Sequence, residues 1–278
     1  VCASAGNHAQ GFAYACQHFG VKGRIYMPVT TPQQKITKTA SFGGNTIEII
    51  MQGDYFDETL KAALEYSENT GAAMLPPFDH LDVIEGQASV GVEILNQLES
   101  PPDMIITPVG GGGLSSGLVK YFNSYEIQFK FCEPMGGRSL FQSLKRKKLI
   151  TLDYVDNFVD GAAVARIGDQ NFNILKNQNI ENVLGIPEGR ICATITEMLN
   201  IEGIVLEPAG ALAIDALKDI RDQIVGKTVV CIASGGNFDF ERLPDIKERA
   251  LRFEGLKKYF ILRMPQRPGA LKDFLNLL

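Results

Sequence analysis

The sequence has no excess of positive charge and no long apolar run. Its formal net charge at pH 7 is −5, and its one basic run, Lys145 to Lys148, is short, which is typical of a solvated surface rather than of a nucleic-acid-binding face. No segment approaches the roughly 18 consecutive apolar residues of a membrane-spanning helix, and the first residues do not have the order of a signal peptide. We therefore expect no nucleic acid and no membrane among its partners.

Histidine and cysteine are too scattered to form a metal site or a disulfide framework. The three histidines, His8, His18 and His80, have no zinc-like spacing to cysteines or carboxylates. The five cysteines are Cys2, Cys16, Cys132, Cys192 and Cys231. Their number is odd and they stand in apolar runs, so we predict reduced core thiols, a cytoplasmic protein and no metal ligands.

What the chain does have is a regular alternation of apolar β-rich runs with stretches of helical spacing. Strands are expected at RIYMPV (24–29), NTIEII (45–50), DMIITPV (103–109), IQFKFCE (127–133) and KTVVCIA (227–233). Helices are expected at residues 8–19, 32–42, 54–69, 85–98, 113–123, 188–200, 209–222 and 239–253. This alternation predicts an α/β fold with parallel sheets covered by helices.

Two interruptions divide the chain. The proline pair in LPPFDH (75–80) resists both helix and strand, so we expect a smaller lobe at residues 1–78 and a larger one at 79–255. After Gly255 the chain changes to a short strand, KYFILRM (258–264), and then to a helix that opens at PQRPG. Residues 256–278 are too few to bury a core, and we interpret them as the truncated start of a third domain.

Four consecutive glycines, Gly110, Gly111, Gly112 and Gly113, stand between an expected strand and an expected helix. Without side chains their backbone N–H groups can approach one anion, and the positive end of the following helix adds to the attraction. The loop lacks the Lys-Ser/Thr ending of a nucleotide P-loop and the spacing of a dinucleotide fingerprint. It favours the phosphate of another cofactor, with a plain flexible turn as the alternative.

Two other turns are informative only in combination. In SGGN (234–237) the hydroxyl of Ser234 follows an apolar strand and can bond a ring nitrogen, although a capped turn explains it equally well. In EPAGALA (207–213) the carboxylate of Glu207 suits the first turn of a helix, which needs no chemistry.

The opening run SAGNHAQG (4–11) combines polar recognition groups with a predicted helix start. Asn7 and His8 are poor helix formers beside a glycine. Their amide and imidazole groups, together with the N–H groups of a helix N-terminus, would suit a small carboxylate. Ser4 as a helix cap and His8 as an ordinary helix-start residue are the alternatives.

The order of these motifs is more specific than any of them. SAGNHAQG, GGGGL, DGAAVARIGD (160–169), EPAGALA and SGGN, in this order, resemble the fold type II pyridoxal-phosphate enzymes of the tryptophan-synthase-β-like superfamily, and among them the biosynthetic threonine dehydratases. YFILRMPQRPGALKDF is similar to the start of that family's ACT-like regulatory domain. The resemblance implies a two-lobed α/β fold followed by the first strand and helix of an ACT-like domain.

The resemblance also implies site residues. The cofactor pyridoxal 5'-phosphate would be bound by Asn7, Gly110, Gly111, Gly112, Gly113, Leu114 and Ser234. The substrate carboxylate would be bound by Ser4, Ala5, Gly6, Asn7 and His8. In this scheme the glycines hold the phosphate, Ser234 the pyridine nitrogen and Asn7 the phenolic oxygen of the ring.

The family's Schiff-base lysine lies in a Ser-Phe-Lys-like motif upstream of SAGNH, and no such motif is present in residues 1–278. Lys22, Lys35 and Lys38 stand in polar surface patterns, and we interpret them as solvated. We therefore expect no catalytic lysine in this chain and no activity from residues 1–278 alone. A non-catalytic module that only senses amino acids is the alternative.

At two places the sequence differs from related enzymes of this superfamily, and the differences disfavour racemisation and a divalent metal. Ala5 stands where related racemases have a second serine, and a methyl group cannot carry a proton, which disfavours racemisation. The run EPMGGRS keeps Glu133 but has Gly137 and Ser139 where cation-binding relatives have later ligands, so no divalent metal is expected.

The resemblance implies deamination of L-threonine to 2-oxobutanoate and ammonia in isoleucine biosynthesis, with L-serine as a second substrate. It further implies isoleucine as an allosteric effector and a homo-oligomer, either a dimer or a tetramer. A catabolic serine/threonine dehydratase or another β-eliminase of the same fold are the alternatives within the superfamily.

Overall fold

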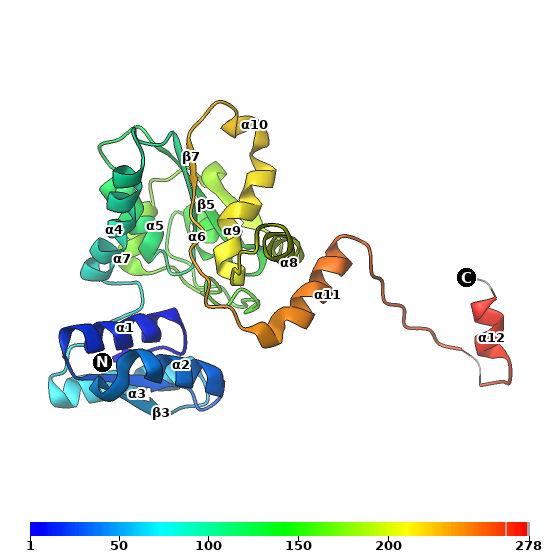
Figure 1. The fold of residues 1–278 in the computed structure, drawn as a ribbon, viewed down its shortest axis with the longest axis horizontal. Coiled ribbons are helices and arrows are strands. Elements are labelled where there is room, and N and C mark those ends of the chain that lie inside the picture. Colours follow the sequence, from blue (N-terminus) through cyan, green and yellow to red (C-terminus); the bar gives the residue numbers. More distant parts are fainter. Residues whose placement is uncertain (265, 277–278) are drawn as a thin grey trace.

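The protein contains two parallel sheets formed by separate parts of the chain (Figure 1). The structure is a computed structural model and describes residues 1–264 and 266–276. The first sheet has the order β1 (Cys2–Ala3), β2 (Gly23–Met27), β3 (Ile47–Met51). The second has the order β6 (Val183–Ile186), β5 (Gln128–Pro134), β4 (Met104–Pro108), β7 (Val229–Cys231). All neighbouring strands run parallel, which confirms the α/β class that the sequence predicts.

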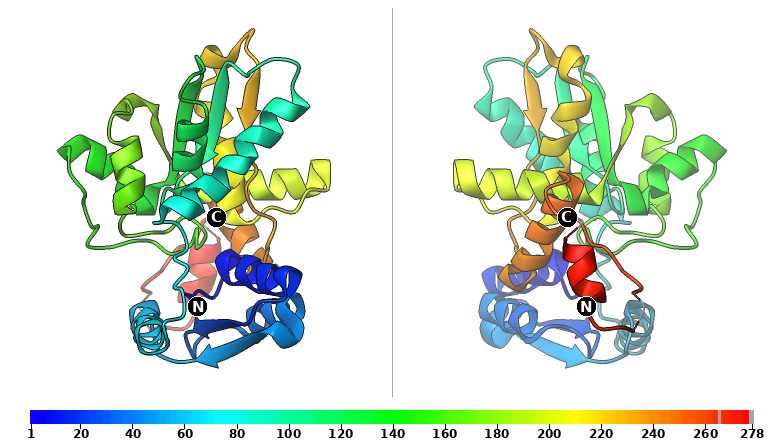
Figure 2. Two further views of the ribbon diagram at one scale, coloured as in Figure 1. Left: turned by 90° about the vertical axis from the view of Figure 1, so that its left-hand side faces the viewer. Right: turned by 90° about the vertical axis from the view of Figure 1, so that its right-hand side faces the viewer.

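Helices surround each sheet, and Figure 2 shows the two sheets with their helices at opposite ends of the molecule. The helices of the first sheet are α1 (Asn7–Phe19), α2 (Gln33–Gly43) and α3 (Phe56–Thr70). Those of the second are α4 (Leu81–Gln97), α5 (Gly113–Tyr121), α6 (Ser139–Arg146), α7 (Asp169–Leu175), α8 (Glu188–Glu197), α9 (Pro208–Ala216), α10 (Arg221–Ile224) and α11 (Leu243–Phe253). A last helix, α12 (Ala270–Leu275), lies apart from both sheets (Figure 1).

The second sheet is buried on both faces. On β4, Met104 and Ile106 pack into a core with residues of α8, α9 and α11, while Ile105 points to the other face and packs with residues of α5, α6 and α7. Two apolar faces explain why DMIITPV is a nearly continuous apolar run rather than an alternating one. The sheet therefore forms a rigid support for the loops at its ends.

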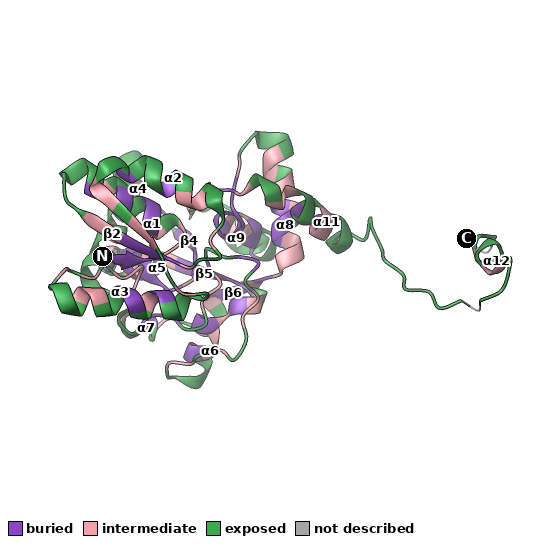
Figure 3. Ribbon diagram, turned by 90° about the horizontal axis from the view of Figure 1, so that it is seen from below, coloured by how far each residue is buried: buried purple, intermediate pink, exposed green. Residues whose placement is uncertain are grey.

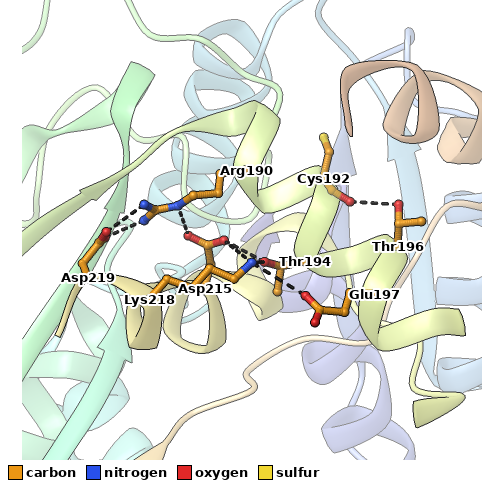
Figure 4. Close-up of polar contacts among 8 residues, drawn as sticks. All are labelled: Arg190, Cys192, Thr194, Thr196, Glu197, Asp215, Lys218 and Asp219. Atoms are coloured by element: carbon orange, nitrogen blue, oxygen red, sulfur yellow. Dashed lines mark hydrogen bonds and ion pairs between the residues drawn. The ribbon is translucent and has the colours of Figure 1, made fainter. Parts of the chain in front are cut away.

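A charged network joins α8 to α9 and to the turn that follows it (Figure 4). Asp215 is fully buried, and it accepts hydrogen bonds from Arg190 Nε at 2.7 Å and from Thr194 Oγ1 at 2.7 Å. The Arg190 guanidinium also bonds Asp219, and Lys218 Nζ lies 2.7 Å from Thr194 Oγ1. Both oxygens of the buried carboxylate thus have partners, which a buried charge requires.

Two short helices that the sequence analysis missed are capped by carboxyl groups from outside the helix, one of them distant in the sequence. The N–H groups of Leu140 and Phe141 in α6 donate to Glu133 Oε1 and Oε2 at 2.7 and 2.9 Å. The N–H groups of Asp169 and Gln170 in α7 donate to Asp79 at 2.9 and 2.8 Å. Because neither cap lies next to its helix in the sequence, no local capping signal precedes either helix.

Other boundaries differ by a few residues from those expected. Helix α4 begins at Leu81 because His80 Nδ1 accepts the N–H of Asp82 at 3.3 Å, a cap that histidine rarely provides. The helix expected at 209–222 ends at Ala216, and a 3₁₀ turn (Leu217–Asp219) separates it from α10. The two-residue β1 and the strand β6 were not expected, since both are too short to give a period.

The strand expected at KYFILRM is wrong. Residues 257–264 form no helix or strand, and this segment leads away from the sheets toward α12 (Figure 3). Ile261 is 98% exposed, so no neighbouring strand covers it within the described residues. A strand needs a hydrogen-bonded neighbour, which the apolar pattern alone cannot supply. The helix expected after it is present as α12, whereas residues 265, 277 and 278 lie outside the described residues.

The cysteines are free thiols, as the sequence predicts, and Cys231 is the one that is only half-buried. Burial raises the pKa of Cys2, Cys192 and Cys231 to about 12 in each case. In residues 1–264 and 266–276, none of the helices has the length and apolar character needed to cross a membrane.

We expect Glu133 to make the free energy of unfolding fall as the pH rises. Its carboxyl is fully buried, and burial raises its pKa from 4.5 to about 7, although the Leu140 and Phe141 N–H bonds oppose the shift. Between these pH values the folded protein holds the proton and the unfolded chain does not, so stability is lost with rising pH, at up to about 1.4 kcal/mol per pH unit. Glu133→Gln removes this contribution.

Urea unfolding of both proteins from pH 5 to pH 8 measures the difference, because the glutamine is neutral throughout. If the two stability curves stay parallel over this range, the carboxyl does not titrate in the folded protein as expected.

Candidate active site

One cavity of about 540 Å³ contains every site residue that the sequence predicts. These residues are Ser4, Ala5, Gly6, Asn7, His8, Gly110, Gly111, Gly112, Gly113, Leu114 and Ser234. The cavity has the size of an ordinary small-molecule or cofactor site, about 300 to 1,000 Å³. Loops and helices beside both sheets line it, so it lies where the two halves of the chain meet.

Strand topology explains why these segments converge. Ser4 follows β1, the glycine loop (Gly110–Gly113) follows β4, and Ser234 follows β7. β4 and β7 are parallel neighbours, with Ile106 opposite Cys231, so their carboxyl ends emerge at one edge of the sheet. That edge is where open parallel sheets bind ligands.

The glycine loop is held in place by hydrogen bonds to the carbonyl oxygen of Gly111. Gly111 O accepts the N–H of Gly168 at 3.1 Å and the buried Asn171 Nδ2 at 3.0 Å. Asn171 Nδ2 also lies 3.1 Å from Phe78 O, which ties the loop to the segment between the two sheets. Within the described residues, no acceptor contacts the four glycine N–H groups, so they are available to an anion.

The loop is too tightly packed for side chains. A Cβ at Gly111 would lie 2.2 Å from Phe78 Cγ, and one at Gly110 would lie 3.0 Å from Ala162 Cα. Gly112 has φ +93°, in the left-handed region that favours glycine. Helix α5 begins at the next residue, so the positive end of its dipole points at the same place.

The turn after β7 fits closely against the start of α9. Glu207 N–H donates to Gly235 O at 3.1 Å. A Cβ at Gly210 would lie 2.3 Å from Gly235 O, and one at Gly235 would lie 2.0 Å from Glu207 Oε1. Gly210 therefore lets the two turns approach each other, and Gly235 leaves room for the Glu207 carboxylate.

The sequence position of Glu207 indicates a residue at the start of a helix, but its carboxylate also contacts Asn7 and the cavity. Its Oε1 accepts Asn7 Nδ2 at 2.9 Å, and it lines the cavity. Burial raises its pKa, against the opposing effect of the Asn7 hydrogen bond. A carboxyl with a raised pKa in a cleft is typical of a functional site.

Asn237 and two lysines were missed by the sequence analysis. Asn237 Nδ2 donates to Asn7 Oδ1 at 2.8 Å, and Lys38 Nζ donates to Asn237 Oδ1 at 2.6 Å. Lys35 lines the cavity and pairs with Asp160 at 3.3 Å. Both lysines on α2 thus reach across to the larger sheet's loops. Lys38 is exposed, as the sequence predicts, but neither contact was expected.

The opening loop differs in detail from the sequence interpretation. Ser4 does not cap α1; its Oγ accepts the N–H of Gly6 at 3.1 Å and so shapes the turn. His8 Nε2 lies 3.0 Å from Leu75 O, and burial lowers its pKa, so Nε2 carries the proton and the ring is neutral at pH 7. The charge available to a carboxylate here is the positive end of α1, which begins at Asn7.

In the part of the chain that the structure describes, no group of three or more histidine, cysteine or acidic side chains is arranged to hold a metal ion. Glu133, the acidic residue of the EPMGGRS run, instead caps α6.

Comparisons with known proteins agree on one family. A sequence model described as pyridoxal-phosphate dependent enzyme matches residues 1–235. The L-threonine dehydratase biosynthetic IlvA of Bacillus subtilis (strain 168) is 48% identical over 278 residues, covering 99% of this chain and 66% of that relative. The protein of the same name from Halalkalibacterium halodurans is 46% identical with the same coverage. The chain thus spans 66% of the length of these curated relatives.

Solved structures give the same result. The processed form of threonine deaminase isoform 2 from Solanum lycopersicum superimposes with a TM-score of 0.83 and 38% identity, over 90% of this chain and 73% of that one. Serine racemase from Dictyostelium discoideum superimposes with a TM-score of 0.76 and 28% identity, over 86% of this chain and 77% of that one.

We expect Gly111→Ala to destabilise the protein, because its methyl group would overlap the Phe78 ring. Overpacking of this kind costs about 1 to 3 kcal/mol of unfolding free energy. Gly86→Ala is the control, since a Cβ on this exposed residue of α4 meets nothing within 4 Å and alanine is favoured in helices by up to about 1 kcal/mol. Chemical denaturation compares the variants; equal stability of the two would mean that Phe78 does not pack on the loop.

Proposed function

This chain belongs to the family of pyridoxal-phosphate dependent enzymes, and we propose that it deaminates L-threonine to 2-oxobutanoate and ammonia. The observation that carries the proposal is the single cavity shared by the glycine loop, Ser234 and the Ser4–His8 loop. Similarity to biosynthetic threonine dehydratases over 99% of the chain supports the choice of substrate. A phosphate group, a flat ring and a small carboxylate each have a suitable partner in this cavity.

The residues present fit the cofactor of this family. Four glycine N–H groups without an acceptor in the described residues, at the N-terminus of α5, suit its phosphate. Added Cβ atoms would collide with Ala162, Phe78 and Ile167, which is why the loop is built of glycine. In the proposal Gly110–Gly113 and Leu114 hold the phosphate, the Ser234 hydroxyl bonds the pyridine nitrogen, and Asn7 bonds the phenolic oxygen.

When bound, pyridoxal phosphate supplies an electron sink for charge that develops at the α-carbon of an amino acid. The Ser234 hydroxyl, unlike a carboxylate, does not hold a proton on the ring nitrogen, so the sink is weak and favours rapid elimination of the β-hydroxyl. The turn from Ser4 to His8 binds the substrate carboxylate at the positive end of α1. Ala5 offers no proton to the opposite face of the α-carbon, which disfavours racemisation.

The proposal places the lysine that binds the cofactor outside residues 1–278. Lys35 is the lysine that lines the cavity, and its ammonium is paired with Asp160 at 3.3 Å. An ammonium held in an ion pair is a poor nucleophile, since it has no free electron pair with which to attack. The tests therefore use the complete protein, and residues 1–278 alone are expected to be inactive.

Regulation by isoleucine and assembly into a homo-oligomer are part of the proposal. Their support is the similarity of YFILRMPQRPGALKDF to the start of an ACT-like domain and the position of α12, which lies away from the two sheets (Figure 1). Segment 257–264 carries exposed apolar side chains, Tyr259, Phe260, Ile261 and Leu262 among them. Such a segment suits pairing within a further domain.

The complete protein should release 2-oxobutanoate and ammonia from L-threonine, and pyruvate and ammonia from L-serine. The two substrates differ by one methyl group, and a pocket that recognises such a group makes their kcat/KM values differ by about 10- to 200-fold. Steady-state rates with each substrate, with and without isoleucine, test activity and regulation together. Preference for β-replacement with sulfide would indicate another reaction of this fold, and binding of amino acids without turnover would indicate a sensing module.

The phosphate site is tested by a pair of nearly isosteric variants, Gly111→Asp and Gly111→Asn. Both side chains overlap Phe78, but only aspartate adds a negative charge beside the phosphate. We expect Gly111→Asp to bind pyridoxal phosphate at least about tenfold more weakly than Gly111→Asn, since one close like-charge contact costs about 1.4 kcal/mol or more. Equal affinities of the two variants in a fluorescence titration would contradict this position for the phosphate.

A further inference from the structure

Four side chains form a hydrogen-bond chain that crosses between the two sheets. Lys38 Nζ of α2 donates to Asn237 Oδ1 at 2.6 Å, and Asn237 Nδ2 donates to Asn7 Oδ1 at 2.8 Å. Asn7 Nδ2 donates to Glu207 Oε1 at 2.9 Å. The four residues come from α2, the turn after β7, the start of α1 and the turn before α9. Asn7, Glu207 and Asn237 line the cavity, whereas Lys38 lies outside it.

The residues at the two ends decide which way the hydrogen bonds run, that is, which side of each amide donates and which accepts. An asparagine amide has a donor side and an acceptor side, so the Asn237–Asn7 pair alone could be reversed by turning both amides over. An ammonium can only donate, and an ionised carboxylate can only accept. Lys38 at one end must donate to Asn237, and ionised Glu207 at the other end must accept from Asn7. Both ends therefore favour the same orientation of the two amides, in which the Asn7 nitrogen faces Glu207.

Glu207 fixes the direction less firmly than Lys38 does. Burial raises the pKa of Glu207, and a protonated carboxyl can donate as well as accept. The ammonium of Lys38 can only donate. Its contact with Asn237 is therefore the less ambiguous of the two ends, even though Lys38 is exposed.

We propose that Lys38 is a positioning residue for Asn7: by fixing the direction of the hydrogen-bond chain, it presents the Asn7 amide nitrogen, rather than its oxygen, to the cofactor site. The inference rests on the proposed function, in which Asn7 bonds the phenolic oxygen of pyridoxal phosphate. After its bond to Glu207, Asn7 Nδ2 keeps a second hydrogen for that oxygen. If the amide were reversed, its oxygen would face two acceptors, Glu207 and the ring oxygen.

Three substitutions of Lys38 distinguish two roles of this residue: fixing the direction of the hydrogen bonds, and simply contacting Asn237. Lys38→Arg keeps a group that can only donate. Lys38→Gln keeps a hydrogen-bonding side chain but can donate or accept, so it does not fix the direction. Lys38→Met removes the polar group while keeping the length of the side chain. Lys22→Met is the matched control, because Lys22 is also an exposed lysine beside the first sheet and its ammonium bonds only Asn45 O, at 2.9 Å, in the described residues.

The experiment is a pyridoxal phosphate titration of the complete protein, freed of cofactor and refilled. We expect the Kd to rise about 5- to 30-fold in Lys38→Met and Lys38→Gln, which corresponds to the loss of one well-oriented hydrogen bond. Lys38→Arg and Lys22→Met should stay within about twofold of the wild type. The absorption spectrum of the bound cofactor, which responds to hydrogen bonding at the ring oxygen, should change in the Met and Gln variants alone.

A purely structural role for Lys38 would change the urea midpoint without changing the spectrum, and that result would overturn the inference. So would wild-type affinity in Lys38→Gln, or a defect in Lys38→Arg equal to that in Lys38→Met. A wild-type protein that does not bind pyridoxal phosphate would instead overturn the proposed function itself. The two failures are therefore distinguishable in one set of titrations.

Discussion

The cavity depends on one buried amide. Asn171 Nδ2 bonds the carbonyl oxygens of Gly111 and Phe78 at 3.0 and 3.1 Å, and so joins the glycine loop to the segment that links the two sheets. Because the loop is held by its carbonyl side, its N–H groups remain directed away from the protein's own acceptors. Donors fixed in advance cost no reorganisation when an anion arrives. The other lining residues of the cavity surround this fixed glycine loop.

The two sheets contribute different things to the cavity. The larger sheet is packed on both faces and supplies the glycine loop and Ser234 from neighbouring parallel strands. The smaller sheet supplies the Ser4–His8 loop and the lysines of α2, which contact the larger sheet's loops through Asp160 and Asn237. A relative movement of the two halves would therefore change the hydrogen bonds of Asn7 directly.

Much of the fold and most of the cavity residues follow from local sequence patterns. The strands β2, β3, β4, β5 and β7 lie within or next to the expected apolar runs. On β4 and β5, burial on both faces gives a nearly continuous apolar composition. The loops at their carboxyl ends could then be placed together from the parallel topology alone. The contact of the His8 ring with Leu75 O shows the limit, because no local pattern indicates that partner.

What the sequence could not predict depends on partners that are not neighbours along the chain. Helices α6 and α7 are capped by Glu133 and Asp79, and the second of these lies 90 residues from its helix. The apolar run at 258–264 has the composition of a strand without a neighbour to pair with among the described residues. Lys38 and Asn237 are nearly 200 residues apart, and no local pattern distinguishes a lysine with a distant partner from a solvated one.

The close fit of two turns limits how this protein can diverge. Gly210 lies against the backbone of Gly235, and Gly235 in turn leaves room for the Glu207 carboxylate. A larger residue at either position would push the other turn away, and the shift would reach Asn7 through Glu207. Substitutions at 210, 235 and 207 are therefore coupled sterically, and a larger side chain at one of them requires a compensating change at another.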